Sequence, residues 1–230
     1  MLQKIRAVLT AAIFIFTIII TIIFMFFFRK KNRIVRKIWA NSQRFIVGFK
    51  IKVQGSLDDK AKLLVINHQS ILDIVIIEAI LEKDKDTAWV AKKEIFDIFL
   101  LSQSVKLSNM ICVNRGDKRA IVKLLKDVKN RVENGRLAVI FPEGTRGKGE
   151  KLLKFQVGAK IIAEKLNLTV QPIVIANARH IFDSQNFSVH SGEAAVTFLP
   201  SINPKDDDKW YENMHANMQK ELTTLLKNIK

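Results

Sequence analysis

The 230-residue sequence contains one cysteine, Cys112. A single cysteine cannot form an intramolecular disulfide, and nothing in the cysteine usage points to an oxidising compartment. Internal repeats and low-complexity linkers are absent as well, so no repeat architecture is expected. The length suits one domain with a sizeable core, and it is too short for two typical domains together with a membrane segment.

Negative charge is scarce. The chain has 22 Asp and Glu against 38 Lys and Arg, which gives a formal net charge of +16. This surplus suits an anionic partner such as nucleic acid, anionic lipid or a phosphorylated substrate. One interpretation is a membrane-tethered protein that recruits nucleic acid or an acidic protein through its basic surface. That interpretation explains the charge, but it does not explain the polar segments described below.

Charge is missing altogether from residues 7–28. At 1.5 Å rise per residue these roughly 22 residues match the hydrocarbon thickness of a bilayer, so they predict a membrane segment. The alternative is a cleaved signal peptide, but the apolar run is too long and no small-x-small cleavage site follows it. The basic stretch "RKKNRIVRK" at 29–37 outweighs Lys4 and Arg6 on the other flank. The positive-inside rule therefore predicts a cell-membrane protein whose following domain is cytoplasmic.

Residues 33–49 place apolar side chains at helical spacing among basic and polar ones, which predicts an amphipathic helix. We expect it to lie on the membrane surface, where each basic residue would contribute about 1 kcal/mol on anionic lipid. The alternative is a core helix of the soluble part. Residues 1–50 are therefore predicted to be a membrane-anchoring helical region, and residues 51–230 a separate α/β domain. Whether the first segment spans the bilayer or lies in one leaflet stays open.

Short strand-like runs alternate with helix-like stretches after residue 48. The runs are "FKIKV" from 49, "LLVI" from 63, "AWVA" from 88, "MICV" from 110, "LAVIF" from 137 and "TVQPIVIA" from 169. This order predicts an α/β fold with a mixed or largely parallel central sheet flanked by helices. Residues 187–199 resemble a hairpin, and residues 205–230 resemble a capped C-terminal helix.

A polar heptapeptide, "NHQSILD" at 67–73, interrupts apolar sequence where a strand should become a helix. Positions five apart on a continuous helix are about 140° out of register, so we expect His68 in the loop, with its ring turned back to Asp73. A carboxylate on one ring nitrogen fixes the tautomer and leaves the other nitrogen free to take a proton from a hydroxyl. The pair is thus a candidate general base with its orienting group.

Two structural interpretations compete with this one. His68 and Asp73 could form a purely structural hydrogen bond, and Asn67 or Ser70 could cap the helix. The His68–Asp73 arrangement lacks the nucleophilic serine that would complete a hydrolase triad. The other three histidines form no ligand-spaced cluster with His68, so no metal is expected.

Two further polar junctions follow predicted strands. In "VIFPEGTRGKGE" Gly144 permits close backbone approach and Arg146 supplies a bidentate donor suited to phosphate. In "ICVNRGDK" Arg115 again follows a strand. The competing interpretation of the first junction is a surface turn in which Glu143 pairs with Arg146. If the strands are neighbours, the arginines and the His68–Asp73 pair converge on one pocket.

Taken together, these blocks resemble the 1-acyl-glycerol-3-phosphate acyltransferases of the glycerolipid acyltransferase superfamily. "NHQSILD" is similar to the family's NHxSxxD block, "VNRGD" to its F-I-x-R block, "FPEGTR" to its FPEGTRS block and "VQPIVI" to its V-P-I/V-I/V-P block. "VAKKEI" and "LLKFQVGA" resemble its K-x-E-L and PFKxGA signatures. The order is kept over most of the chain after residue 50. The departures are Gly147 for serine, Lys154 for proline, Gln156 for lysine, and Ala176 at the end of the last block.

The resemblance implies acyl transfer from acyl-coenzyme A or acyl carrier protein to the 2-hydroxyl of lysophosphatidic acid, which gives phosphatidic acid for phospholipid biosynthesis. No cofactor is expected beyond the donor substrate. The expected partners are membrane lipids and the two substrates, without nucleic acid. An acyltransferase for another lysophospholipid, or a remodelling enzyme, is the nearer alternative. The implied catalytic residues are His68 and Asp73, and the implied substrate-binding residues are Asn67, Ser70, Arg115, Glu143, Gly144, Thr145 and Arg146.

Overall fold

The structure is a computed structural model that describes residues 2–114 and 120–229. Its strands are β1 (Phe49–Gln54), β2 (Leu63–Ile66), β3 (Thr87–Lys92), β4 (Ile111–Val113), β5 (Leu137–Ile140), β6 (Val170–Ala176), β7 (Phe182–Asp183), β8 (Ser188–Val189) and β9 (Gly192–Phe198). Its helices are α1 (Leu2–Phe27), the 3-10 helix η1 (Arg29–Lys31), α2 (Asn32–Val47), α3 (Leu72–Ile80), α4 (Lys93–Asp97), α5 (Phe99–Leu107), α6 (Ala120–Glu133), α7 (Gly158–Leu166), α8 (Ala178–Ile181) and α9 (Trp210–Asn228).

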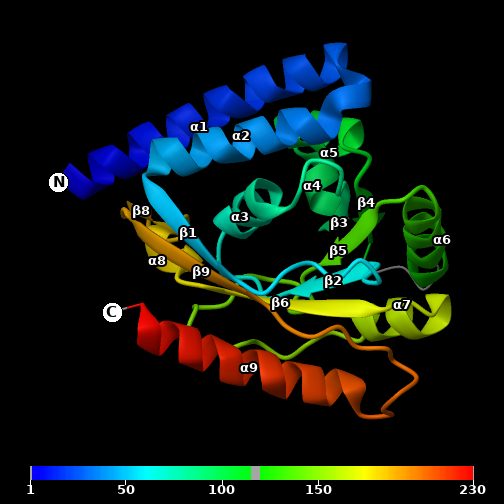
Figure 1. The fold of residues 1–230 in the computed structure, drawn as a ribbon. Coiled ribbons are helices and arrows are strands. Elements are labelled where there is room, and N and C mark those ends of the chain that lie inside the picture. Colours follow the sequence, from blue (N-terminus) through cyan, green and yellow to red (C-terminus); the bar gives the residue numbers. More distant parts are fainter. Residues whose placement is uncertain (1, 115–119, 230) are drawn as a thin grey trace.

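Seven strands form one twisted sheet in the order β1-β9-β6-β2-β5-β3-β4 (Figure 1). Neighbouring strands are parallel except β6 and β9, which are antiparallel, so β1 and β9 run opposite to the other five. β2 and β5 are short, fully buried apolar runs at the centre, as expected for parallel strands that are covered on both faces. The predicted α/β fold with a mixed, largely parallel sheet is confirmed.

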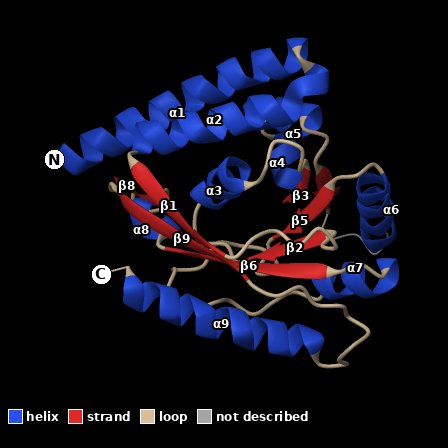
Figure 2. Cartoon of the chain, in the orientation of Figure 1, coloured by secondary structure: helices blue, strands red, loops and turns tan. Residues whose placement is uncertain are grey.

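The two faces of the sheet carry separate cores, and alternate residues of β2 point to each. Leu64 and Ile66 pack with α2, α3 and α8, whereas Leu63 and Val65 pack with α6, α7 and α9. In Figure 2 the sheet accordingly lies between α1 to α5 on one side and α7 and α9 on the other. The central strands thereby hold the loops at their carboxyl ends between two helical layers.

α1 and α2 lie side by side in opposite directions across one face of the domain (Figure 1). Arg6, near the start of α1, donates hydrogen bonds to the carbonyl oxygen of Val47 at 3.2 Å and to Ser191 Oγ at 2.9 Å. The segment 6–27 of α1 is long and apolar enough to cross a membrane, by length and composition. The second of the two helices, α2, ends at Val47, and β1 begins at Phe49, just before the predicted boundary at residue 50. The division into two domains stays a prediction.

The predicted amphipathic helix is present as α2, but two of its basic residues are not available for the expected contact with lipid. Arg33 and Arg36 are buried: Arg33 pairs with Glu78 at 2.8 Å, and Arg36 pairs with Asp86. The apolar side chains of Ile34, Ile38 and Phe45 are exposed instead, Phe45 by 88%. The polar face of α2 is thus the one that meets the protein, because the buried Glu78 of α3 and the half-buried Asp86 of the following loop neutralise its arginines.

The predicted hairpin at 187–199 is wrong in its pairing. β8 pairs with β7, whereas β9 joins the main sheet between β1 and β6. The predicted C-terminal helix is present as α9, and it buries Trp210, Met214 and Leu222 against the second core. Its N-cap residue, Lys209, makes no side-chain capping hydrogen bond within the described part of the chain, and Asp207 Oδ1 accepts from the Lys209 backbone N–H at 2.8 Å just before the helix.

Candidate functional site

His68 and Asp73 meet at the carboxyl end of β2. β2 ends at Ile66, and α3 begins at Leu72, so His68 lies in the connecting loop and Asp73 in the first turn of the helix. His68 Nδ1 lies 2.8 Å from Asp73 Oδ2. Because a carboxylate only accepts hydrogen bonds, Nδ1 carries a proton, and in the neutral imidazole Nε2 then has the lone pair. The geometry predicted from the spacing of the two residues is confirmed.

Asp73 is held rigidly in this position. Its Oδ2 also accepts hydrogen bonds from the backbone N–H groups of Gln69 at 2.6 Å and Ser70 at 2.8 Å, and the residue is fully buried. Three donors on one oxygen fix the carboxylate and close the loop into a tight turn. The carboxylate that orients the imidazole is therefore itself fixed to the backbone of the loop.

Two other contacts fix His68. Its ring stacks on Phe141, with centroids 3.9 Å apart and planes inclined by 9°. Its backbone N–H donates to Glu143 Oε1 at 2.7 Å, and its carbonyl oxygen accepts from the N–H of Gly147 at 2.8 Å. The side chain is 17% exposed, so the ring is both restrained and reachable. Sequence reasoning missed the stacking of Phe141 on His68, although Phe141 begins the block "FPEGTR".

Glu143 joins the two loops rather than pairing with Arg146. It is 4% exposed, and its second oxygen, Oε2, accepts from the backbone N–H of Leu153 at 2.7 Å. Burial raises the pKa of the Glu143 carboxyl, while the N–H groups of His68 and Leu153 oppose that shift. The structure thus gives Glu143 a role in positioning His68, and its substrate contact stays a prediction.

Asn67 and Ser70 are likewise engaged within the protein. The Asn67 side chain exchanges two hydrogen bonds with the backbone of Ile175 in β6, at 2.9 and 2.7 Å. Ser70 Oγ donates to the carbonyl oxygen of Phe182 at 2.6 Å and accepts from the N–H of Leu72 at 3.2 Å. Both side chains are buried. They hold the loop against β6 and β7, and their predicted substrate contacts stay untested.

The loop after β5 exposes Arg146 and is joined to the histidine loop through its backbone. Gly144 adopts φ +67°, a conformation that L side chains rarely adopt, and this bend turns the chain so that Thr145 and Arg146 are exposed. Arg146 Nη1 donates to Ser184 Oγ at 2.7 Å. The N–H of the following residue, Gly147, contacts the backbone of His68, so the loop that carries Arg146 is attached to the histidine loop, and the contact of Arg146 with substrate stays a prediction.

Sequence reasoning also missed Arg179, which anchors the same loop. Its Nη1 donates to the carbonyl oxygen of Gly147 at 2.8 Å, and its Nη2 pairs with Asp183 at 3.0 Å. No motif marks this residue, because its importance arises only from the fold. Arg115, by contrast, lies outside the described residues. The strand before it, β4, is separated from β5 by β3.

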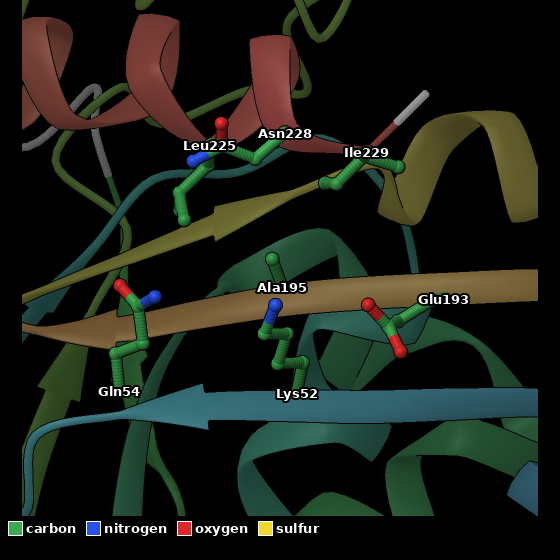
Figure 3. Close-up of a pocket in the computed structure, with 7 residues that line it drawn as sticks. All are labelled: Lys52, Gln54, Glu193, Ala195, Leu225, Asn228 and Ile229. Atoms are coloured by element: carbon green, nitrogen blue, oxygen red, sulfur yellow. The ribbon is translucent and has the colours of Figure 1, made fainter.

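A small pocket lies elsewhere in the molecule. It is lined by residues of β1, β9 and the end of α9, including Lys52, Glu193 and Leu225 (Figure 3). Its volume of about 20 Å³ suits a single water molecule rather than a substrate. The candidate site is instead at the carboxyl ends of β2 and β5, where polar groups converge in the way typical of open α/β sheets.

The chain is similar to proteins of one known family. Residues 50–176 match the family model described as Acyltransferase. The chain is 40% identical over 222 residues to a 1-acyl-sn-glycerol-3-phosphate acyltransferase from Helicobacter pylori, an alignment that covers 95% of this chain and 93% of that protein. A protein of the same name from Limnanthes douglasii is 30% identical over 164 residues, which are 70% of this chain and 58% of that one.

A solved structure shares the fold. The crystal structure of the 1-acyl-sn-glycerophosphate acyltransferase PlsC from Thermotoga maritima aligns with a TM-score of 0.77 at 21% identity, and the alignment covers 97% of this chain and 95% of that one. The family match includes His68, Asp73 and Arg146. The chain therefore belongs to the acyltransferase family, with the 1-acyl-sn-glycerol-3-phosphate acyltransferases as its relatives.

Proposed function

We propose that this enzyme transfers an acyl group from a thioester donor to the 2-hydroxyl of 1-acyl-glycerol-3-phosphate, giving phosphatidic acid. The observation that carries the proposal is the 2.8 Å contact between His68 Nδ1 and Asp73 Oδ2, which leaves Nε2 free at the edge of a basic loop. A general base of this kind suits an alcohol that must lose its proton during attack. The buried Ser70 Oγ is hydrogen-bonded to the backbone of Phe182 and Leu72, which fits direct transfer with the lipid hydroxyl as the nucleophile.

The reaction then follows from the positions of these groups. His68 Nε2 takes the proton as the hydroxyl oxygen attacks the thioester carbonyl, and Asp73 stabilises the resulting imidazolium. The tetrahedral intermediate collapses with cleavage of the C–S bond, and the imidazolium returns the proton to the leaving thiolate. The donor is acyl-coenzyme A or acyl carrier protein, and no other cofactor enters the step. The stacked Phe141 and the bonds from Glu143 and Gly147 to the histidine backbone keep the base in place.

Recognition of the acceptor is assigned to its phosphate. Arg146 is exposed on the loop whose Gly147 contacts the His68 backbone, and a guanidinium binds phosphate through paired N–H donors. We assign Arg115, Gly144 and Thr145 to the same task from their places in the resembling blocks. The overall charge of +16 also favours arrival of either anionic donor.

Membrane attachment supplies the lipid substrate. α1 is long and apolar enough for a membrane, and the basic residues that follow it favour a cytoplasmic catalytic domain. Together with the exposed apolar side chains of α2, such as Ile38 and Phe45, α1 would keep the domain at the membrane surface, where a lysolipid is concentrated.

The deciding experiment offers the purified enzyme lysophosphatidic acid, other lysophospholipids and both donor types, and identifies the products by mass. We expect phosphatidic acid from lysophosphatidic acid, and a His68→Ala variant that is slower by about 10² to 10⁴-fold. His180→Ala is the matched control, because that histidine is exposed on α8, outside the site. A product formed only from another lysolipid would move the enzyme to a different acceptor. Near-normal turnover by His68→Ala would remove the proposed base.

A further inference from the structure

A second cavity, of about 360 Å³, opens at the other end of the sheet. Its wall is formed by the turn between α1 and α2, the end of α5, and the residues that directly precede β3 and β5. The lining includes Arg29, Arg36, Lys106, Arg136, Asp86 and Ser108. Arg136 precedes β5, whereas Phe141, the residue stacked on His68, follows it. Five residues of extended chain separate the two by roughly 15 Å, so this cavity is distinct from the proposed active site.

The cavity is strongly basic. Four cationic side chains line it against one carboxylate, a difference of three positive charges. Asp86 is already shared, since it pairs with Arg36 and lies 2.7 Å from Arg136 Nε. Arg29 and Lys106 make no ion pair with a carboxylate in the part of the chain that the structure describes. This excess charge favours an anion.

Buried polar atoms in the wall lack partners. Ser108 is 4% exposed and Arg36 is 5% exposed, yet Ser108 Oγ and Arg36 Nε have no hydrogen-bond partner among the described residues. Both can donate a hydrogen bond. The amide oxygen of Asn32, an acceptor, is unpaired in the same wall. Buried polar groups are nearly always satisfied, so this wall is suited to a ligand with anionic oxygens and a hydroxyl.

The surroundings of the opening indicate where such a ligand comes from. Phe26, Phe27 and Phe28 directly precede Arg29 and are 54, 73 and 49% exposed, and Ile34, two residues after Asn32, is 42% exposed. A basic cavity beside exposed apolar side chains matches a phosphate attached to acyl chains. We propose that this cavity binds the headgroup of an anionic glycerophospholipid, with its phosphate near Ser108, Arg29 and Lys106.

The experiment measures binding of phosphatidylglycerol to the full-length protein in neutral detergent, by native mass spectrometry, with zwitterionic phosphatidylcholine as the reference lipid. We expect one phosphatidylglycerol bound more tightly than phosphatidylcholine. Ser108→Ala should weaken that binding roughly tenfold, because a hydrogen bond to a charged group is lost. The unpaired hydroxyl contributes nothing to the lipid-free fold, so the unfolding temperature without lipid should stay unchanged or rise.

Charge-matched double variants separate a site from general attraction. Arg29→Gln with Lys106→Gln should weaken phosphatidylglycerol binding more than tenfold. Lys30→Gln with Lys31→Gln also removes two positive charges, both from the turn that contains Arg29. These residues do not line the cavity, so the affinity for phosphatidylglycerol should be kept. Arg146→Ala, at the other end of the sheet, should keep it as well. This cavity and the proposed active site are therefore tested independently.

Three results would overturn the proposal. One is equal losses in the two double variants, which would make the attraction non-specific. Another is unchanged affinity in Ser108→Ala. The third is displacement of the lipid by an equal concentration of sn-glycerol 3-phosphate, which would assign the cavity to a free phosphate. Should Ser108→Ala fail to fold, the pair of double variants still decides between a site and diffuse attraction.

Discussion

At the scale of single residues, the site depends on one carboxylate oxygen that holds three donors. Asp73 Oδ2 accepts from the His68 ring and from two backbone N–H groups. In Asp73→Asn the amide oxygen can keep these contacts, but the negative charge that stabilises the imidazolium is gone. We expect turnover to fall by roughly 10² to 10⁴-fold with little change in the Michaelis constant, measured with saturating donor. A variant with normal turnover would assign the pair a purely structural role.

Arg146 offers a test of acceptor recognition. Its described contact is a single hydrogen bond to Ser184 on the surface, so Arg146→Ala should cost little stability. We expect the apparent affinity for lysophosphatidic acid to fall at least tenfold, and far more than that for an acceptor without the phosphate. Lys205→Ala, an exposed lysine before α9, is the charge-matched control. Equal losses for both acceptors would move Arg146 to donor binding or to loop structure.

Cys112 invites a different mechanism, in which a thiolate takes the acyl group first. Burial raises the pKa of this thiol, which favours its neutral form. The sheet order also places β5 and β3 between β2 and β4, so Cys112 lies roughly 14 Å from the strand that leads to His68. Cys112→Ser should therefore keep most of the activity, and thiol-blocking reagents should inhibit weakly. An acylated Cys112, trapped from enzyme and donor alone and able to acylate added acceptor, would contradict direct transfer.

At the scale of secondary-structure elements, the sequence predicts contacts well where they are local. The spacing of His68 and Asp73 within one turn is sufficient for their contact, and the apolar runs of β2 and β5 mark buried strands. The orientation of α2 could not be predicted in this way. Arg33 and Arg36 look like surface residues until Glu78, 45 and 42 positions later, is brought against them by α3. Likewise, Ser188–Val189 pairs with β7 because the longer β9 is taken by the main sheet.

Glu78 joins α2 to the domain and should be costly to remove. It is 2% exposed and accepts hydrogen bonds from Arg33, Thr87 and Trp89, with Arg36 3.6 Å away. In Glu78→Ala two buried guanidinium groups lose this partner. We expect the free energy of unfolding in detergent to fall by about 3–5 kcal/mol, measured by denaturant titration. The control is Glu133→Ala, which removes an exposed ion pair with Lys129 on α6, so the free energy of unfolding should change little.

The same carboxylate predicts a pH dependence of stability. Burial alone would raise the pKa of Glu78, but attraction to Arg36 and Arg33 and the bonds from Thr87 and Trp89 outweigh it and hold that pKa below its ordinary value. The unfolded chain then binds more protons, so this contribution is present above the unfolded pKa and is lost as the pH falls through the folded pKa. Wild type should lose stability in acid more steeply than Glu78→Ala. Parallel acid profiles would contradict this cause.

At the scale of the whole molecule, the placement of α1 decides how the enzyme meets its membrane. A helix that crossed the bilayer would carry its first residues roughly 30 Å away from a domain attached at its other end. Arg6 instead donates to Val47 and Ser191 of the domain, and the helix runs back along α2. Exposed apolar side chains occur on both helices, among them Phe16 and Phe24 on α1 and Phe45 on α2. We therefore infer that the pair lies in one leaflet with this apolar surface towards the lipid.

Cysteine labelling tests this placement. In a Cys112→Ser background, one cysteine is introduced at residue 3 and, in a separate variant, at Asp206 in the loop before α9. A membrane-impermeant maleimide should label neither cysteine in intact cells and both after permeabilisation, because a helix pair in the cytoplasmic leaflet keeps both ends of α1 on the side of the domain. Labelling at residue 3 alone in intact cells would show that α1 crosses the bilayer. That result would also require Arg6 to leave its contacts with Val47 and Ser191, so the two arrangements exclude each other.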